Sequence, residues 1–371
     1  MNKSNHFKTF TIALQHVLAM YAGAVAVPLL VGNAIGLDKH QIAFLVQADL
    51  FTCGIATILQ SFGLGKHIGI KMPVILGVTF AAVGPMITIG QHLGMPYVYG
   101  SIIISGLMVL CLSGVFSKLK SFFPSVVIGS ILIIIGISLL PVAFQWAAGG
   151  SGAKNYGALH HLLVAFGVLG LIIFLIRFTR GLIKTIAILL GIIIGTLVET
   201  FMGHASFEQV YQEPWISLVT PFWFGIPRFD LAAILTMCLV AIICMIESTG
   251  VFLALGDLTD REVTSKDIAK GLRAEGLAFI LGSILNSFPY TTFSQNVGLV
   301  AITKVKSCVL TGVAGVILMA LGLFPKLAAV ISSIPLPVLG GAGIVMFGVV
   351  AVAGIEKLSK LDFKQESNQL I

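Results

Sequence analysis

Four ionisable residues interrupt long apolar runs of this sequence: His16, Asp49, Glu247 and Glu275. A charged side chain at the centre of a membrane-spanning helix costs about 2.5–3.5 kcal/mol or more, so each of them is a candidate functional residue. A carboxyl group at Glu247 or Glu275 can accept hydrogen bonds from a polar ligand or take up a proton. The competing interpretation of Glu247 is a structural tie between helices, and that of Glu275 is an interfacial ion pair with Arg273.

The other two ionisable residues are weaker candidates for a functional role. His16 follows Gln15 in an otherwise apolar run and is equally compatible with a functional role and with a hydrogen-bonded histidine inside a helix bundle. Asp49 lies near the middle of its run, and we expect it to hydrogen-bond a neighbouring helix.

Two apolar segments, residues 71–86 ("KMPVILGVTFAAVGPM") and 288–303 ("FPYTTFSQNVGLVAIT"), carry Pro and Gly where a continuous helix would not. Broken helices at membrane depth are tolerated only where protein or a water-filled cavity covers the free backbone groups. The β-branched and aromatic runs predict short strands that pair with each other and lead into half-helices. Half-helix N-termini attract carbonyl groups. With the amides of Gln295 and Asn296, they suit a planar heterocycle with alternating N–H and C=O groups.

The elements that must position these residues are membrane-spanning helices. Hydrophobic residues make up 57% of the 371 positions and charged residues 10%, and the mean hydropathy is +1.04. Soluble domains carry about 25% charged residues. Apolar runs long enough to cross a bilayer recur along the chain, which excludes a β-barrel of short alternating strands. We predict twelve spans, near residues 10–31, 40–61, 70–90, 97–116, 124–145, 159–177, 182–201, 229–252, 267–287, 289–305, 307–324 and 335–355.

The basic residues predict the orientation of the chain. If the N-terminus is cytoplasmic, the predicted cytoplasmic segments hold 18 of the 22 Lys and Arg residues, as the positive-inside rule expects. Both termini are therefore predicted to be cytoplasmic, and the net charge of +7 reflects topology and not nucleic-acid binding. The N-terminal run lacks a cleavage site and is expected to be a retained first span.

No motif in the sequence points to enzyme chemistry. The five cysteines are scattered singly, which argues against disulfides and zinc sites. Neither H-E-x-x-H nor G-x-S-x-G occurs, so we expect no enzyme, no metal and no cofactor. A purely scaffolding bundle is an alternative, but it does not explain paired polar breaks in the spans.

The polar motifs together resemble the nucleobase-ascorbate transporter family along essentially the whole chain. The matching motifs are Gln295-Asn296-Val297-Gly298 with Thr303-Lys304, the Gln15-His16 pair, Glu247, and the Arg-Ala-Glu-Gly run that contains Glu275. The resemblance implies an all-α polytopic fold of fourteen spans in two inverted seven-span repeats, with short strands in broken spans 3 and 10 and with core and gate domains. Residues 1–201 would form the first repeat, 202–228 an external connection and 229–371 the second repeat. About twelve spans are present, and we expect the last two to be missing.

The same resemblance implies the substrate site. Glu247 and Gln295 would bind the base through their side chains, and the main chain near Phe80 and Ser294 would complete the site. Asn296 would support the pocket.

Proton coupling would involve Glu275 and Glu247, with His16 as a supporting residue. The proton would be the coupling ion, and the resemblance also suggests a homodimer.

Glutamine at position 295 is similar to the purine-transporting branch, the bacterial xanthine and urate permeases, whereas uracil-type members tend to carry glutamate there. We therefore expect a proton-coupled symporter that imports a purine across a bacterial cytoplasmic membrane. A uracil permease of the same family and an anion carrier of the related sulfate-transporter fold are the alternatives.

Overall fold

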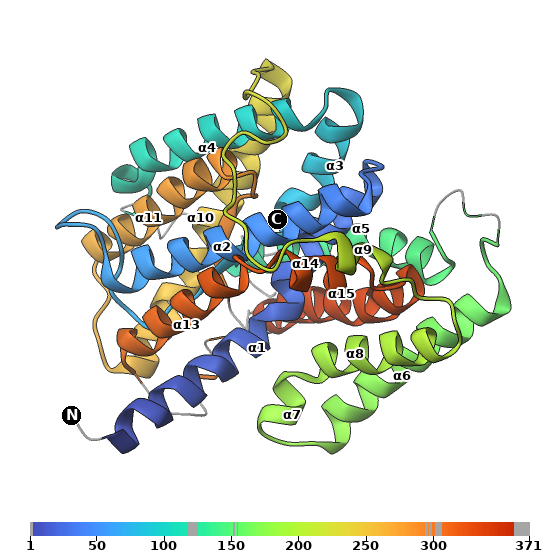
Figure 1. The fold of residues 1–371 in the computed structure, drawn as a ribbon. Coiled ribbons are helices and arrows are strands. Elements are labelled where there is room, and N and C mark those ends of the chain that lie inside the picture. Colours follow the sequence, from blue (N-terminus) through green and yellow to red (C-terminus); the bar gives the residue numbers. More distant parts are fainter. Residues whose placement is uncertain are drawn as a thin grey trace. The chain divides into compact units, whose positions relative to one another are not determined.

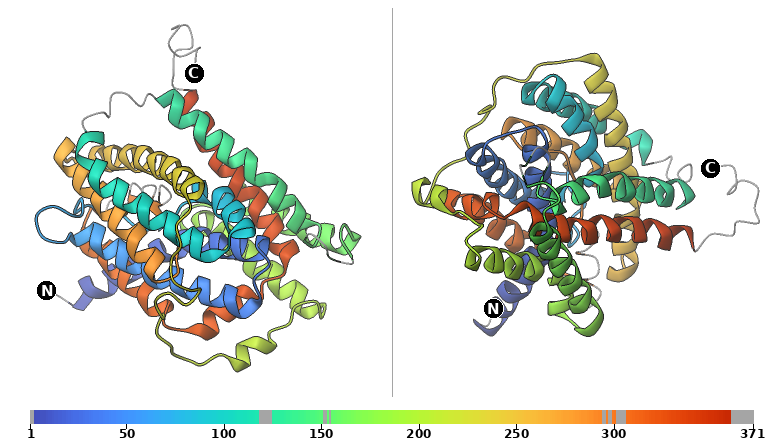
Figure 2. Two further views of the ribbon diagram at one scale, coloured as in Figure 1. Left: turned by 90° about the horizontal axis from the view of Figure 1, so that it is seen from above. Right: turned by 90° about the vertical axis from the view of Figure 1, so that its right-hand side faces the viewer.

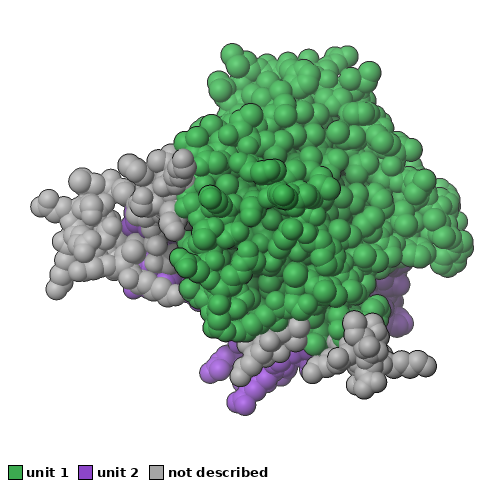
Figure 3. All heavy atoms as spheres, turned by 90° about the vertical axis from the view of Figure 1, so that its left-hand side faces the viewer, with its two compact units in different colours: residues 1–120, 209–332 green, residues 121–208, 333–371 purple. Residues whose placement is uncertain are grey.

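The computed structural model describes residues 3–117, 125–150, 153, 155–293, 296, 299–300 and 306–359. The chain divides into two compact units, each formed by two separate segments (Figure 3). Unit 1 comprises Met1–Lys120 and Gln209–Ser332, and unit 2 comprises Ser121–Glu208 and Ser333–Ile371. Each unit thus draws on both halves of the sequence. The assignment of residues 1–201 and 229–371 to inverted repeats stays a prediction.

Unit 1 contains long apolar helices and two short strands (Figure 1). In unit 1, α4 packs against α10 and α11, and α2 packs against α1, α11 and α13. The elements are α1 (Lys3–Ala34), α2 (Lys39–Phe62), β1 (Leu76–Val78), the 3-10 helix η1 (Phe80–Ala82), α3 (Val83–His92), α4 (Met95–Phe116), α10 (Leu231–Thr259), α11 (Ser265–Ile284), β2 (Tyr290–Thr292), α13 (Cys308–Leu321) and α14 (Pro325–Ser332). The short helix α9 (Glu208–Gln212) lies where the chain passes from unit 2 to unit 1.

Unit 2 is built around the pair α5 and α15, which run side by side (Figure 2). A Cβ added to Gly129 of α5 would lie 2.9 Å from the carbonyl oxygen of Gly354 of α15, so glycine permits the close approach of the two backbones. The helices of unit 2 are α5 (Ser125–Ala147), α6 (Leu159–Phe178), α7 (Leu182–Thr185), α8 (Ala187–Phe201) and α15 (Leu336–Leu358).

Small residues also set the helix crossings in unit 1. A Cβ added to Gly54 of α2 would lie 2.4 Å from the carbonyl oxygen of Gly315 of α13. A Cβ added to Gly106 of α4 would lie 2.8 Å from that of Gly276 of α11. Membrane helices pack through such small residues because lipid supplies no hydrophobic drive between them.

Local sequence explains where several helices begin. Asp38 precedes α2 and forms a capping box, in which its Oδ1 accepts from the Gln41 N–H at 2.8 Å and its own N–H donates to Gln41 Oε1 at 3.0 Å. Thr264 and Asp267 form the equivalent box at the start of α11. These caps satisfy N–H groups that have no partner inside the helix.

Six helices in the described part of the chain are long and apolar enough to cross a membrane. A seventh span results if α13 and α14, which meet at an 81° bend, count as one. The chain is therefore mostly helical with several apolar spans, and the count of twelve spans stays a prediction. The predicted span at 70–90 is divided among β1, η1 and α3, and much of the one at 289–305 lies outside the described residues.

Candidate functional site

The two broken segments of unit 1 meet as an antiparallel pair of strands. Leu76 of β1 lies opposite Thr292 of β2, and Val78 lies opposite Tyr290. The pairing continues past both ends of the ladder, because the Thr79 N–H donates to the carbonyl of Pro289 and the Phe293 N–H to that of Ile75, each at 3.0 Å. The sheet therefore satisfies backbone groups that a break in a helix leaves free.

Helix α2 supplies polar side chains to β1. The Leu76 N–H donates to Thr57 Oγ1 at 3.1 Å, and the Cys53 thiol donates to the Leu76 carbonyl at 2.7 Å. Both side chains are fully buried. The buried strand end thus obtains its partners from the neighbouring helix, which holds β1 in place.

Helix α10 binds β2 through the residue that follows Glu247. The Ser248 hydroxyl shares a hydrogen bond of 3.0 Å with Thr291 Oγ1 and accepts from the Thr292 N–H at 3.3 Å. Glu247 is partly exposed, whereas Ile246 and Ser248 on either side of it are buried. This arrangement places a partly exposed glutamate beside the strand pair.

Glu275 of α11 also contacts β2 and is 1% exposed. The Thr292 hydroxyl donates to its Oε1 at 2.8 Å. Its Oε2 is buried and has no hydrogen-bond partner among the described residues. The carboxyl groups of Glu247 and Glu275 lie within range of each other's charge, so a proton taken up by one changes the electrostatic environment of the other.

His16 of α1 and Asn296 form a buried pair. The Asn296 amide lies 3.0 Å from His16 Nδ1 and donates to the His16 carbonyl at 3.3 Å. His16 is 0% and Asn296 2% exposed. The structure therefore brings together two residues that the sequence placed in separate roles, pocket support and proton coupling.

The remaining predicted contacts are described only in part. Phe80 is partly exposed and begins η1, which packs against α10. Ser294 and Gln295 lie outside the described residues, so their roles stay predictions.

Sequence reasoning missed the polar partners of the carboxyl groups. Asp49 Oδ1 accepts from the hydroxyls of Ser287 and Tyr290, each at 2.9 Å, which joins α2 to β2. Tyr290 and Thr292 each reach a carboxyl group, and Thr291 between them reaches Ser248 instead. The strict alternation of side chains along a strand was the signal that could have indicated this arrangement.

The site offers carboxyl, hydroxyl and amide groups. Within the described ranges, no group of three His, Cys, Asp or Glu residues is placed to hold a metal ion. An accessible carboxyl beside a rigid strand pair can accept hydrogen bonds from a small polar molecule, and a buried carboxyl behind it can hold a proton.

Comparison with known sequences relates the chain to bacterial transporters. A model of a family described as "Permease family" matches residues 7–371. The xanthine permease of Bacillus subtilis (strain 168) is 53% identical over 364 residues, which are 98% of this chain and 83% of that protein. The uric acid permease PucK of the same organism is 51% identical over 99% of this chain and 85% of its own length. The uric acid transporter UacT of Escherichia coli (strain K12) is 45% identical over 96% of this chain and 74% of its own length.

Solved structures share the fold at low sequence identity. The transmembrane domain of the cyanobacterial bicarbonate transporter BicA superposes with a TM-score of 0.70 at 16% identity, covering 98% of this chain and 94% of that domain. The overall structure of SLC26A9 gives a TM-score of 0.63 at 13% identity, covering 94% of this chain and 58% of that one. These likenesses concern the fold alone.

Proposed function

Since this chain belongs to the nucleobase-ascorbate transporter family, we propose that it is a proton-coupled symporter that imports a purine base, xanthine or urate. The family and its matched relatives are permeases, and this chain has several helices that can cross a membrane, so the prediction of a membrane transporter and not an enzyme is confirmed. The names of three relatives, a xanthine permease and two uric acid transporters, support the purine.

The observation that carries the proposal is the partly exposed Glu247 beside the strand pair. Its neighbour Ser248 is hydrogen-bonded to both Thr291 and Thr292, which holds this turn of α10 against β2. In the proposed complex, Glu247 accepts hydrogen bonds from purine N–H groups, and the main chain near Phe80 supplies further contacts. Gln295 and Ser294 complete the site in this proposal, and Asn296 supports it through His16.

Glu275 is the proposed proton carrier. It is buried beside β2, with one oxygen bonded to Thr292 and the other without a partner among the described residues. Burial disfavours a charged carboxyl and so favours uptake of a proton. The carboxylates of Glu247 and Glu275 repel each other when both are charged. Substrate binding at Glu247 is then coupled to the protonation of Glu275. Transport follows as the core domain moves against the gate domain. In this proposal both termini are cytoplasmic and the protein is a homodimer. The proton is the coupling ion, and no other cofactor is required.

The substrate is tested by uptake of labelled xanthine in cells lacking purine permeases, at two external pH values, with urate, hypoxanthine, guanine, uracil and sulfate as competitors. We expect urate or another purine to compete and uptake to rise at the lower pH. Competition by uracil alone would indicate the pyrimidine permease, and competition by sulfate the anion carrier.

The site is tested by three variants. Glu247→Gln and Gln295→Ala should weaken substrate binding about 10- to 100-fold, because a hydrogen bond to a charged or buried polar group is worth about 1.5–3 kcal/mol. Glu275→Gln should keep binding, measured as substrate-induced thermal stabilisation, but lose the pH dependence of uptake. Glu262→Gln, an exposed carboxyl outside the site, is the matched control. Unchanged binding and uptake in both Glu247→Gln and Gln295→Ala would show that the assigned site is wrong.

A further inference from the structure

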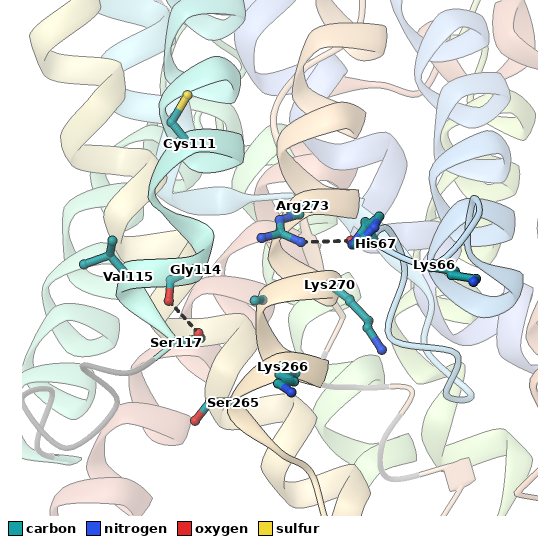
Figure 4. Close-up of a pocket in the computed structure, with 11 residues that line it drawn as sticks. Lys66, His67, Cys111, Gly114, Val115, Ser117, Ser265, Lys266, Lys270 and Arg273 are labelled. Atoms are coloured by element: carbon teal, nitrogen blue, oxygen red, sulfur yellow. Dashed lines mark hydrogen bonds between the residues drawn. The ribbon is translucent and has the colours of Figure 1, made fainter.

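A cavity with a basic lining lies in unit 1, away from the strand pair. It has a volume of about 610 Å³ and is lined by the last turns of α4, the segment between α2 and β1, and the first turns of α11 (Figure 4). Cavities of about 300–1,000 Å³ accommodate small-molecule groups. None of the residues assigned to purine or proton binding lines it.

The lining of this cavity is strongly basic. Among the described residues it includes Lys66, His67, Lys266, Lys270 and Arg273, and no acidic residue. Figure 4 shows Arg273 of α11 directed at His67, in the segment that also carries Lys66. Such a concentration of positive charge favours an anion.

Three of the four Lys and Arg side chains have no carboxylate partner in the part of the chain that the structure describes. Lys66 and Lys266 are exposed. Arg273 donates only to neutral acceptors, Ser113 Oγ at 3.1 Å and the His67 carbonyl at 3.5 Å. Lys270 alone lies near a carboxylate, Asp267 at 3.7 Å, and Asp267 is shared with Arg261 at 3.4 Å. The cavity therefore keeps a net positive charge.

The apolar surface of α4 leads into the cavity. Leu107, Cys111 and Val115 follow each other at intervals of four residues and so share one face of the helix. Leu107 is 45% and Val115 58% exposed, and Cys111 is also exposed. Helix α4 is long and apolar enough to cross the bilayer, so this face suits an acyl chain whose head lies at the basic end.

We propose that this cavity binds the phosphodiester head group of an anionic phospholipid, with an acyl chain along the α4 face. Free phosphate carries a similar charged group and could also bind the basic residues. Only a lipid has an acyl chain that can pack along the apolar α4 face. Basic pockets at the cytoplasmic ends of spanning helices are suited to such head groups, and all four Lys and Arg side chains lie in segments predicted to be cytoplasmic. The proposal does not depend on the transported substrate.

The test compares phosphatidylglycerol, phosphatidylcholine and inorganic phosphate as probes, with the purified protein in detergent. Bound lipid is counted by native mass spectrometry, and stabilisation is measured by thermal unfolding. We expect stabilisation by phosphatidylglycerol and little effect of the other two. The double variant Lys66→Gln/Lys266→Gln should weaken phosphatidylglycerol binding about 25-fold, since each basic side chain near an anionic surface contributes about fivefold.

A second variant removes the space without changing the charge. Gly114 lines the cavity, and a Cβ added there would lie 3.6 Å from Arg273 Nη2, an ordinary contact. The Cβ of Gly114→Leu is therefore accommodated, and the rest of its side chain should fill the cavity and abolish the specific lipid effect; an unchanged unfolding temperature without lipid checks that the variant folds. The control Arg180→Gln/Lys184→Gln removes two exposed basic residues of unit 2 and should leave binding unchanged.

Three outcomes would overturn the proposal. Equal loss in the control would show non-specific attraction of anionic lipid. Stabilisation by inorganic phosphate as large as that by phosphatidylglycerol would assign the cavity to free phosphate. Unchanged lipid binding in Gly114→Leu would place the lipid elsewhere. Since none of these readouts uses purine uptake, failure here is distinguishable from failure of the proposed transport function.

Discussion

Two buried carboxyl groups of unit 1 obtain their partners from β2 and the residues just before it. Tyr290 and Ser287 donate to Asp49, and Thr292 donates to Glu275. Asp49 Oδ1 has two hydroxyl donors and Glu275 Oε1 has one, and the second carboxyl oxygen of each residue is buried with no hydrogen-bond partner among the described residues. The additional donor supports a structural role for Asp49, and Glu275 remains the candidate for proton exchange.

The Tyr290 hydroxyl should contribute to stability and not to substrate binding. It lies 2.9 Å from Asp49 Oδ1 and 2.7 Å from Ser287 Oγ. Tyr290→Phe should lower the free energy of unfolding by about 1–3 kcal/mol, because a buried carboxyl loses a donor. Thermal unfolding in detergent measures the change, and a purine-binding assay should show unaltered affinity.

Tyr21 provides the matched control for this variant. Its hydroxyl is buried and has no hydrogen-bond partner among the described residues. Tyr21→Phe should therefore leave stability unchanged or raise it. A loss of stability in Tyr21→Phe as large as that in Tyr290→Phe would contradict the importance of the Asp49 contacts.

At the scale of elements, Phe293 fills the space between α1 and β1. A Cβ on Gly77 would lie 2.2 Å from Phe293 Cε2, and a Cβ on Gly23 would lie 2.9 Å from its Cε1. Glycine at these positions is thus required by close approach. The ring holds the strand pair against α1, the helix that also carries His16.

Gly77→Ala should displace Phe293 and disturb the strand pair. Overpacking of this kind costs about 1–3 kcal/mol, so the unfolding temperature and purine binding should both fall. In Gly77→Ala/Phe293→Leu the smaller side chain should restore part of the loss. Gly84→Ala in α3, where a Cβ meets no atom within 4 Å, should be neutral or stabilising; a loss in this control equal to that of Gly77→Ala would contradict the steric argument.

At the scale of the whole molecule, each unit combines segments from distant parts of the sequence. Unit 1 needs the segment up to Ser332, and unit 2 needs α15 against α5, so neither unit can form from the first half of the chain alone. The side of the membrane on which each connection lies is set by the distribution of Lys and Arg, and its prediction can be tested directly.

Single cysteines in a cysteine-free background report the orientation. Tyr211→Cys lies in the connection predicted to be external, and Glu262→Cys in a segment predicted to be cytoplasmic; both positions are exposed. A membrane-impermeant maleimide should label position 211 in intact cells and position 262 only after permeabilisation. The reverse pattern would invert the predicted topology, and labelling of both in intact cells would refute the count of spans between them.

The sequence alone was sufficient to identify an apolar, polytopic transporter and its candidate residues Glu247, Glu275 and His16. The reason is physical: charge within an apolar run is expensive, so its presence indicates a use. Family membership was predicted from short polar motifs, each of which lies within a few consecutive residues.

Only the tertiary structure decided which polar groups meet. His16 and Asn296 are 280 positions apart, and Asp49 and Tyr290 are 241 apart. Their contacts depend on how α1 and α2 pack around the strand pair, which local patterns do not encode. The basic cavity likewise depends on tertiary packing, because its basic residues come from segments about 200 residues apart, such as those of His67 and Arg273. In the sequence, these Lys and Arg residues indicated only the orientation of the chain.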